Sequence, residues 1–207
     1  VPSEIWSPRD VDEVEAYLCV HKFTAVLDAG HGFDADISQI AFAAAAQMNL
    51  PYVRIVRPMW DITAPAERAA SVAEAALMIR PEARVFAATG RGTLDQYHPF
   101  SGARLYLRQT NAQARSALPP FAEAVFGQPP FTRAAEAELF RRLQIDTLVL
   151  RNVGGAPSRP KLDAALDLGL RVIVIDRPSP PAGAQALHGA EAGLRWIETL
   201  PRKGVGL

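Results

Sequence analysis

The chain has 207 residues, with 22 lysines and arginines against 22 aspartates and glutamates. This balance excludes a general attraction to nucleic acid or to an anionic membrane surface. The single Cys19 excludes an intramolecular disulfide and a cysteine zinc cluster, which suits a cytoplasmic protein. No apolar run approaches the roughly 18 residues that a membrane-spanning helix needs, so we expect a soluble protein without nucleic-acid or membrane partners.

The first elements that the sequence predicts are a helix that begins near Asp10 and a strand, helix and strand over residues 23–58. A mononucleotide-binding half normally starts with a strand, a glycine-rich turn and a helix. None of these precedes Pro2, and the first residue is Val1. We therefore expect that an amino-terminal segment is missing from this sequence.

The middle of the chain predicts alternating elements. Its pattern favours a helix over 66–80, a strand at Val85 that leads into a glycine turn, a short helix over 93–97 and a strand over 104–108. A proline-rich loop over 118–131 and a helix over 132–143 follow, with Thr132 as the capping residue. We interpret this last region as the connection between two domains, residues 1–115 and 116–207.

A second strand, helix and strand unit occupies residues 146–178. The runs 148–150 and 172–175 consist of Val, Ile and Leu, as is typical of strands buried on both faces, and 161–168 has helical periodicity. Such connections are right-handed, so the loop over 151–160 opens at the carboxyl edge of a parallel sheet, where ligands of α/β proteins bind. A last helix is predicted over 189–200.

The two units resemble each other. Val149 lies 123 positions after Val26, and Arg177 lies 120 positions after Arg57, with a proline next to each arginine. Strand, glycine-containing loop, helix, strand and Arg-Pro thus recur in one order. The repeat predicts an α/β fold with two Rossmann-like parallel-sheet halves around a shared cleft.

The loops after the strands hold the candidate site residues. Asp28 and His31 flank Gly30, which allows the backbone to approach a ligand, but Asp28 is equally suited to cap a turn or the next helix. The run 151–155 ends in two glycines and can form an anion nest or a plain turn. The turn at Gly90 is similar. No histidine pair has metal-ligand spacing, so no metal site is predicted.

Arginines gather at the predicted strand ends. Arginine suits bidentate contact with carboxylates or phosphates, so the pattern predicts that this edge binds a polyanion, although solvated surface charge is the simpler interpretation. Trp60 either stacks on a flat ligand or belongs to the core. The arginines concerned are Arg54, Arg57, Arg91, Arg108, Arg151 and Arg177.

These same residues resemble the motifs of the precorrin-6A reductase family of cobalamin biosynthesis, in order and over essentially the whole chain. The matching segments are Asp28-Ala29-Gly30-His31-Gly32-Phe33-Asp34, Ser38, Arg57-Pro58-Met59-Trp60, Gly90-Arg91, Arg108, residues 128–131, Glu136, Arg151-Asn152-Val153-Gly154-Gly155, Lys161-Leu162-Asp163-Ala164-Ala165 and Arg177-Pro178.

The resemblance implies that NADPH and a corrin precursor lie between two Rossmann-like halves and that a hydride is transferred to a ring carbon of the macrocycle. Its carboxylates fit the arginine edge, and neighbouring enzymes of the cobalamin pathway are further expected partners. The implied catalytic residues are His31, Asp28 and Lys161. The implied substrate-binding residues are Arg57, Trp60, Arg91, Arg108 and Arg177. The implied NADPH-binding residues are Gly90, Arg91, Arg151, Asn152, Gly154 and Gly155.

The chain also departs from the family pattern. Gly30, Gly32, Arg151 and Val153 replace the family's Thr, Pro, Lys and Ser, and its Gly-Gly-Thr phosphate loop has no counterpart. We expect tighter NADPH binding, by calorimetry, from a version extended with that turn than from the chain as given. Two alternatives stay open: a non-catalytic tetrapyrrole-binding paralogue, and an unrelated nucleotide-binding α/β enzyme that shares only the fold.

Overall fold

The computed structural model describes residues 3–110 and 118–201. The chain divides into two compact units. Unit 1 comprises residues 1–58 and 178–207, and unit 2 comprises residues 59–177. The backbone therefore passes from one unit to the other directly after Pro58 and directly after Arg177, so that the two Arg-Pro motifs of the repeat mark the two crossings.

Unit 1 has a parallel sheet. In the part of the chain that the structure describes, its three strands are β1 (Val26–Asp28), β2 (Tyr52–Val56) and β9 (Gln185–His188), in the order β1-β2-β9. The register places Asp28 opposite Arg54. The sequence pattern did not predict β9, because most of its residues are exposed and it has no apolar run.

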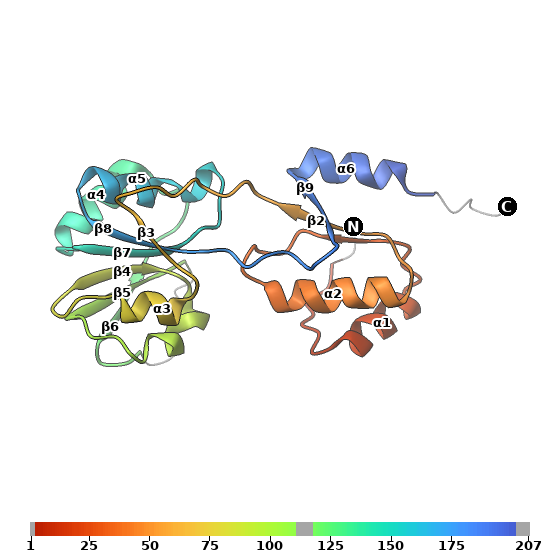
Figure 1. Cartoon of the computed structure of the whole chain (residues 1–207), viewed down its shortest axis with the longest axis horizontal. Coiled ribbons are helices and arrows are strands. Elements are labelled where there is room, and N and C mark those ends of the chain that lie inside the picture. Colours follow the sequence, from red (N-terminus) through yellow and green to blue (C-terminus); the bar gives the residue numbers. More distant parts are fainter. Residues whose placement is uncertain (1–2, 111–117, 202–207) are drawn as a thin grey trace. The chain divides into compact units, whose positions relative to one another are not determined.

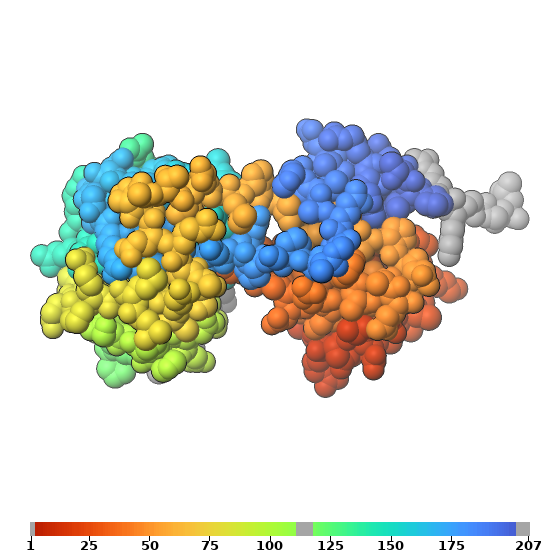
Figure 2. Space-filling model, viewed as in Figure 1, coloured from red at the N-terminus to blue at the C-terminus, as the bar shows by residue number. Residues whose placement is uncertain are grey.

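Helices cover both faces of this sheet. Helices α1 (Val11–Val20) and α2 (Ala35–Gln47) lie on one side and α6 (Ala190–Thr199) lies on the other (Figure 1). Helix α6 approaches closely through Gly193, where an added Cβ would come within 2.9 Å of the Cδ1 atom of Ile55. The blue carboxyl-terminal segment accordingly lies directly against orange residues of the same unit (Figure 2).

Unit 2 has a larger parallel sheet. Its six strands, counted over residues 3–110 and 118–201, have the order β3-β8-β7-β4-β5-β6. They are β3 (Glu67–Ala69), β4 (Arg84–Ala88), β5 (Arg104–Gln109), β6 (Ala122–Phe126), β7 (Thr147–Arg151) and β8 (Arg171–Ile175). The central strands are almost entirely buried, which explains their continuous apolar sequences.

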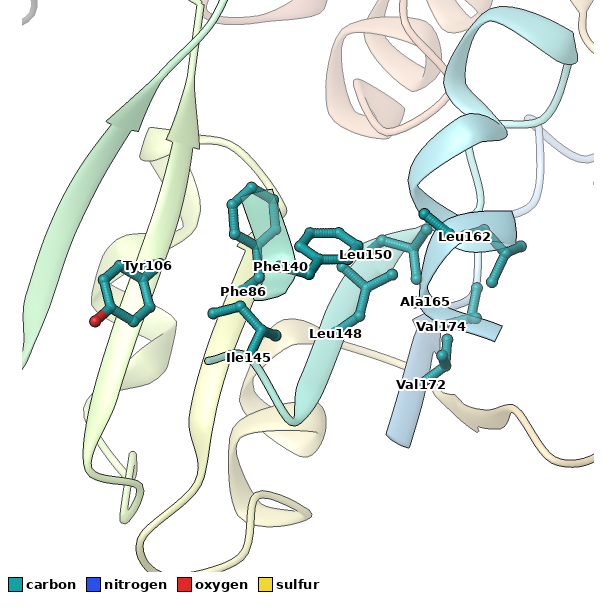
Figure 3. Close-up of a cluster of buried hydrophobic side chains, with 11 residues drawn as sticks. Phe86, Tyr106, Phe140, Ile145, Leu148, Leu150, Leu162, Ala165, Val172 and Val174 are labelled. Carbon is teal, nitrogen blue, oxygen red and sulfur yellow. The ribbon is translucent and has the colours of Figure 1, made fainter. Parts of the chain in front are cut away.

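The core of unit 2 lies between this sheet and helices α4 and α5. Phe86 of β4 meets Phe140 of α4 edge to face, with ring centroids 5.1 Å apart, and aliphatic side chains of β7, β8 and α5 continue the cluster (Figure 3). The helical segments of this unit are α3 (Val72–Leu77), η1 (Arg91–Tyr97), α4 (Arg133–Arg142), η2 (Ala156–Ser158) and α5 (Pro160–Asp167).

The predicted α/β class with two parallel sheets is confirmed. The two strand, helix and strand units are β1-α2-β2 and β7-α5-β8, and the strands within each unit are parallel neighbours. The cap at Thr132 is also confirmed, because its hydroxyl accepts a hydrogen bond from the backbone N–H of Ala135 at 3.2 Å.

Two element predictions were wrong. The helix predicted over 66–80 is shorter, since Glu67–Ala69 forms strand β3 beside β8 and the helix begins after the Ser71 cap. The loop predicted over 118–131 contains strand β6, which pairs with β5. Both strands lie at the edges of the sheet, where partial exposure removes the apolar run that marks a buried strand.

The division of the chain also differs from the predicted one. The expected boundary between residues 115 and 116 lies outside the described residues, but β5 and β6, on either side of it, pair in one sheet. The expected connecting region, 118–143, belongs to unit 2. The cause is the return of β9 to pair with β2, a long-range contact that local patterns do not reveal.

Candidate functional site

The sheet of unit 2 has a topological switch point between β4 and β7. These strands are neighbours, yet β5, which follows β4, lies on one side of the pair, and β8, which follows β7, lies on the other. The loops that leave the two strands therefore diverge, and ligands of α/β proteins bind in the crevice at such a point. The structure thus brings together the two predicted cofactor loops, which begin at Gly90 and Arg151.

The glycines of these loops have backbone conformations that other residues rarely adopt. The φ angles are +87° at Gly90, +68° at Gly154 and +73° at Gly155. The guanidinium of Arg151 reaches over the first loop, because a Cβ added at Gly90 would lie 3.3 Å from the Nη2 atom of Arg151. A glycine backbone open to close approach and a neighbouring guanidinium are features that suit a phosphate group.

Trp60 is attached to the second loop through three hydrogen bonds. The side chain of Asn152 accepts a bond from the backbone N–H of Trp60 and donates one to its carbonyl, each at 3.0 Å, and the indole N–H donates to the carbonyl of Gly155 at 2.9 Å. Asn152 is 3% exposed. The amide predicted to bind the cofactor is therefore engaged in holding Trp60, which packs at the margin of the core.

A buried ion pair joins β5, the neighbour of β4, to helix α4. The Nη2 atom of Arg108 is 2.6 Å from Oε2 of Glu136, with the side chains 9% and 1% exposed. The guanidinium lies between the rings of Phe86 and Phe131, 5.0 and 4.4 Å from their centroids. Arg108 was expected at an open substrate edge. The structure instead gives it an internal partner, since an arginine in this register at the end of β5 faces the first turn of α4.

Gly127 makes room for this arginine, because a Cβ added there would overlap the Nη1 atom of Arg108. Burial lowers the pKa of Arg108 and raises the pKa of Glu136, and in each case the charge of the partner opposes the shift. Desolvation of the two charges therefore offsets part of the stabilisation that their attraction provides. It fixes α4 to the carboxyl end of β5.

Lys161 lies in the first turn of α5, next to the second loop. Its Nζ donates a hydrogen bond to the carbonyl of Ser158 at 3.0 Å. Burial lowers the pKa of Lys161, whereas the negative charge of Glu136 raises it. Burial has the larger effect, so the pKa of Lys161 is lowered overall.

The carboxylate of Asp28 in unit 1 has three donors. It accepts hydrogen bonds from the backbone N–H of Gly30 at 2.8 Å and the hydroxyl of Tyr52 at 2.7 Å, and it forms an ion pair with Arg54. Burial raises the pKa of Asp28, but the hydrogen bonds and the charge of Arg54 outweigh it and lower the pKa overall. Burial and the hydrogen bond to Asp28 raise the pKa of Tyr52, although the charge of Arg54 lowers it. Asp28 therefore stays ionised.

His31 is exposed at the turn that follows Asp28. Its Nδ1 atom accepts a hydrogen bond from the backbone N–H of Phe33 at 3.3 Å, so that in the neutral ring the proton lies on Nε2. The Nη2 atom of Arg54 donates to the carbonyl of His31 at 3.2 Å. Asp28 was also considered as a cap for a turn or for the next helix. It caps the turn, through its bond with the N–H of Gly30, whereas the N-cap residue of α2 is Asp34.

The remaining predicted arginines are divided between the units. Arg57 follows β2 in unit 1, whereas Arg91 begins η1 and Arg177 ends unit 2. Arg54 was also expected to face a ligand, but it is 4% exposed and bound to Asp28. Cross-strand register explains this outcome, because Arg54 lies directly opposite Asp28 on the neighbouring strand. A single cleft shared by the arginines of both units stays a prediction.

The ionisation of Asp28 predicts a pH-dependent contribution to stability. Because its folded-state pKa is lowered, the contribution is complete above the pKa of about 3.9 in an unfolded chain and is lost as pH falls through the lower folded value. We expect Asp28→Asn to reduce the free energy of unfolding at pH 7, with the difference from wild type shrinking toward pH 3. Urea denaturation at several pH values measures this, and a constant difference would contradict it.

The family comparison decides between the interpretations. Residues 5–198 match the family model described as Precorrin-6x reductase CbiJ/CobK. The chain belongs to this reductase family. A precorrin-6A reductase of Mycobacterium tuberculosis is 34% identical over 204 residues, which cover 98% of this chain and 83% of that relative. A cobalt-precorrin-6A reductase of Priestia megaterium is 28% identical over 81% of this chain and 70% of that relative.

A solved structure agrees with this membership. The structure named CobK precorrin-6A reductase matches with a TM-score of 0.87 at 33% identity, over 96% of this chain and 82% of that one. The predicted class, an oxidoreductase of cobalamin biosynthesis, is confirmed by the family, and the hypothesis of an unrelated enzyme with a shared fold was wrong. Nothing in these matches favours the non-catalytic paralogue. Within residues 3–110 and 118–201, no helix is both long and apolar enough to cross a membrane.

Some residues that support the candidate site residues were not predicted from the sequence. Tyr52 and Glu136 were not predicted as partners of Asp28 and Arg108. A weak signal existed only for the ion pair of Asp28 with Arg54, because these two residues lie opposite each other once β1 and β2 are taken as parallel neighbours. The pair of Arg108 with Glu136 joins a strand to a helix that starts 24 residues later, and no sequence pattern indicates which face of that helix is covered.

Proposed function

We propose that the chain reduces precorrin-6A with NADPH, adding a hydride and a proton to one double bond of the macrocycle. The switch point of unit 2, with its positive-φ glycines, carries this proposal. The backbone at Gly90, Gly154 and Gly155 would receive the phosphates of NADPH, with Arg91 and Arg151 supplying positive charge. The bound cofactor supplies the hydride.

The protein residues have separate tasks in this scheme. Asn152 holds Trp60 beside the Gly154-Gly155 loop, which gives the site a flat apolar surface of fixed orientation. Lys161 and His31 are the candidates for supplying the proton or for binding the substrate near the accepting carbon. Exclusion of water and correct orientation are the main contributions expected of a protein whose cofactor does the redox chemistry.

The substrate carries several acetate and propionate carboxylates, so arginines are suitable contacts. We expect Arg57→Ala, Arg91→Ala and Arg177→Ala each to weaken tetrapyrrole binding by about 1–3 kcal/mol, the range for charge-assisted hydrogen bonds. Arg133→Ala is the matched control, since this arginine is 60% exposed and pairs with Asp167 on the surface of unit 2. Absorbance titration gives the affinities, and unchanged binding in all three variants would refute an anion-binding cleft.

The decisive test of the proposed function is a turnover assay without oxygen. Purified protein, precorrin-6A and NADPH are expected to give loss of NADPH absorbance together with the spectral change of the macrocycle, in equal molar amounts. Binding of the tetrapyrrole without NADPH consumption would support the non-catalytic alternative. The same assay with the cobalt complex of the substrate and with NADH tests the choice of substrate and cofactor.

Location and partners complete the proposal. The exposed single Cys19 suits a reducing compartment, which supports a cytoplasmic enzyme. Enzymes that make or use the macrocycle are the further partners expected for a protein that handles a reactive pathway intermediate.

A further inference from the structure

Arg54 bridges two points of the loop that presents His31. One guanidinium nitrogen, Nη1, binds the carboxylate of Asp28, and the other, Nη2, donates to the backbone carbonyl of His31 at 3.2 Å. The carboxylate in turn binds the backbone N–H of Gly30. The planar guanidinium therefore fixes the loop at its beginning, directly through Asp28, and at His31 itself.

Asp28 and Arg54 form a buried ion pair. Their side chains are 9% and 4% exposed. A buried ion pair often contributes little net stability, because desolvation of the charges offsets their attraction. Tyr52 adds a third member, since its hydroxyl donates to Asp28 at 2.7 Å while its ring packs edge to face on Phe42. These contacts define the geometry of one loop.

From these contacts we infer that Arg54 is a positioning residue for His31, with Asp28 and Tyr52 as its supports. Asp28 then acts in the reaction through the loop that it orders, and its carboxylate is occupied by donors from Gly30, Tyr52 and Arg54. This inference rests on the proposed function, in which His31 acts on the tetrapyrrole. It assigns a role to Arg54 that differs from the ligand contact expected of the arginines at strand ends.

Arg54→Lys tests the bridge with little risk to folding. A lysine keeps the positive charge beside Asp28 but lacks the second nitrogen of the fork, so the bond to the His31 carbonyl is lost. We expect kcat to fall roughly 10-fold with KM for NADPH unchanged, because a small misplacement of a reacting group lowers turnover more than binding. Tyr52→Phe is expected to give a smaller decrease. Arg68→Lys, at an exposed pair with Asp176, is the matched control.

A double-mutant cycle with His31→Gln separates positioning from general damage. If Arg54 acts through His31, Arg54→Lys has no further effect on kcat in the His31→Gln background. Multiplicative effects, or normal turnover of His31→Gln alone, would overturn the inference while the wild-type protein still reduced the substrate. Failure of the wild-type protein to consume NADPH would instead refute the proposed function. Thermal unfolding of each variant confirms that its fold is retained.

Discussion

Replacing His31 with glutamine is expected to lower kcat by about 10²- to 10⁴-fold, the range for loss of a positioned proton donor. Glutamine keeps a polar side chain of similar reach, so the KM for the tetrapyrrole is expected to change little. The geometry supports a specific role, because the Phe33 N–H binds Nδ1 and so places the proton of the neutral ring on Nε2. Steady-state assays of kcat and KM on the purified variant measure both effects.

His21 provides the matched control for this experiment. It is exposed in the same unit, but it follows α1 and precedes β1, at the opposite end of that strand from His31. His21→Gln is expected to leave kcat within a factor of two of wild type. A similar loss in both variants would indicate a general effect on unit 1, and normal turnover in His31→Gln would show that His31 is only a turn residue.

Removal of the Glu136 carboxylate is expected to give a large loss of stability in unit 2. Glu136→Ala leaves the guanidinium of Arg108 buried without its counter-charge, which typically costs about 3–5 kcal/mol in the free energy of unfolding. The double variant Arg108→Met with Glu136→Leu removes both charges and fills similar volume, so it is expected to recover most of this loss. A double variant less stable than Glu136→Ala would contradict the argument from desolvation.

Tryptophan fluorescence can follow this unfolding unit by unit. The sequence has Trp6, Trp60 and Trp196, of which only Trp60 belongs to unit 2. In a background with Trp6→Phe and Trp196→Phe, urea denaturation monitored by fluorescence reports the unit that contains Glu136. The indole bond from Trp60 to the Gly155 carbonyl makes this probe sensitive to the loop of the site as well.

The sequence predicted the central strands and the edge strand β1, but it did not predict the other three edge strands. Strands β7 and β8 are buried on both faces, so their apolar runs are continuous and identify them. The unpredicted strands β3, β6 and β9 each lie at the edge of a sheet, and their exposed positions break the pattern. A local sequence pattern indicates whether a strand is buried. It does not indicate whether a partly exposed segment forms hydrogen bonds with the edge strand of a sheet.

The same limit applies to the site. The positions of Gly90, Arg151 and Gly155 after strands were predicted, but the pairing of β4 with β7 was not, because the expected boundary placed these two strands in different halves. The sequence also did not distinguish an arginine that faces a ligand from one that binds an internal carboxylate. Arg54, in the middle of β2, and Arg108, near the end of β5, carry the same charge as the other arginines, and only the register and the helix packing reveal Asp28 and Glu136 beside them.

The discontinuity of unit 1 has a consequence for synthesis on the ribosome. All residues of unit 2, from 59 to 177, have been polymerised before the first residue of β9 is made, whereas β2 must wait for Gln185–His188 before its second neighbour exists. Unit 2 can therefore form its sheet during synthesis, while unit 1 still lacks β9. Until β9 is made, the backbone groups of β2 that later pair with it are open to pairing with other chains. A carboxyl-terminal truncation before Gln185 therefore removes a strand from the unit that contains the amino terminus.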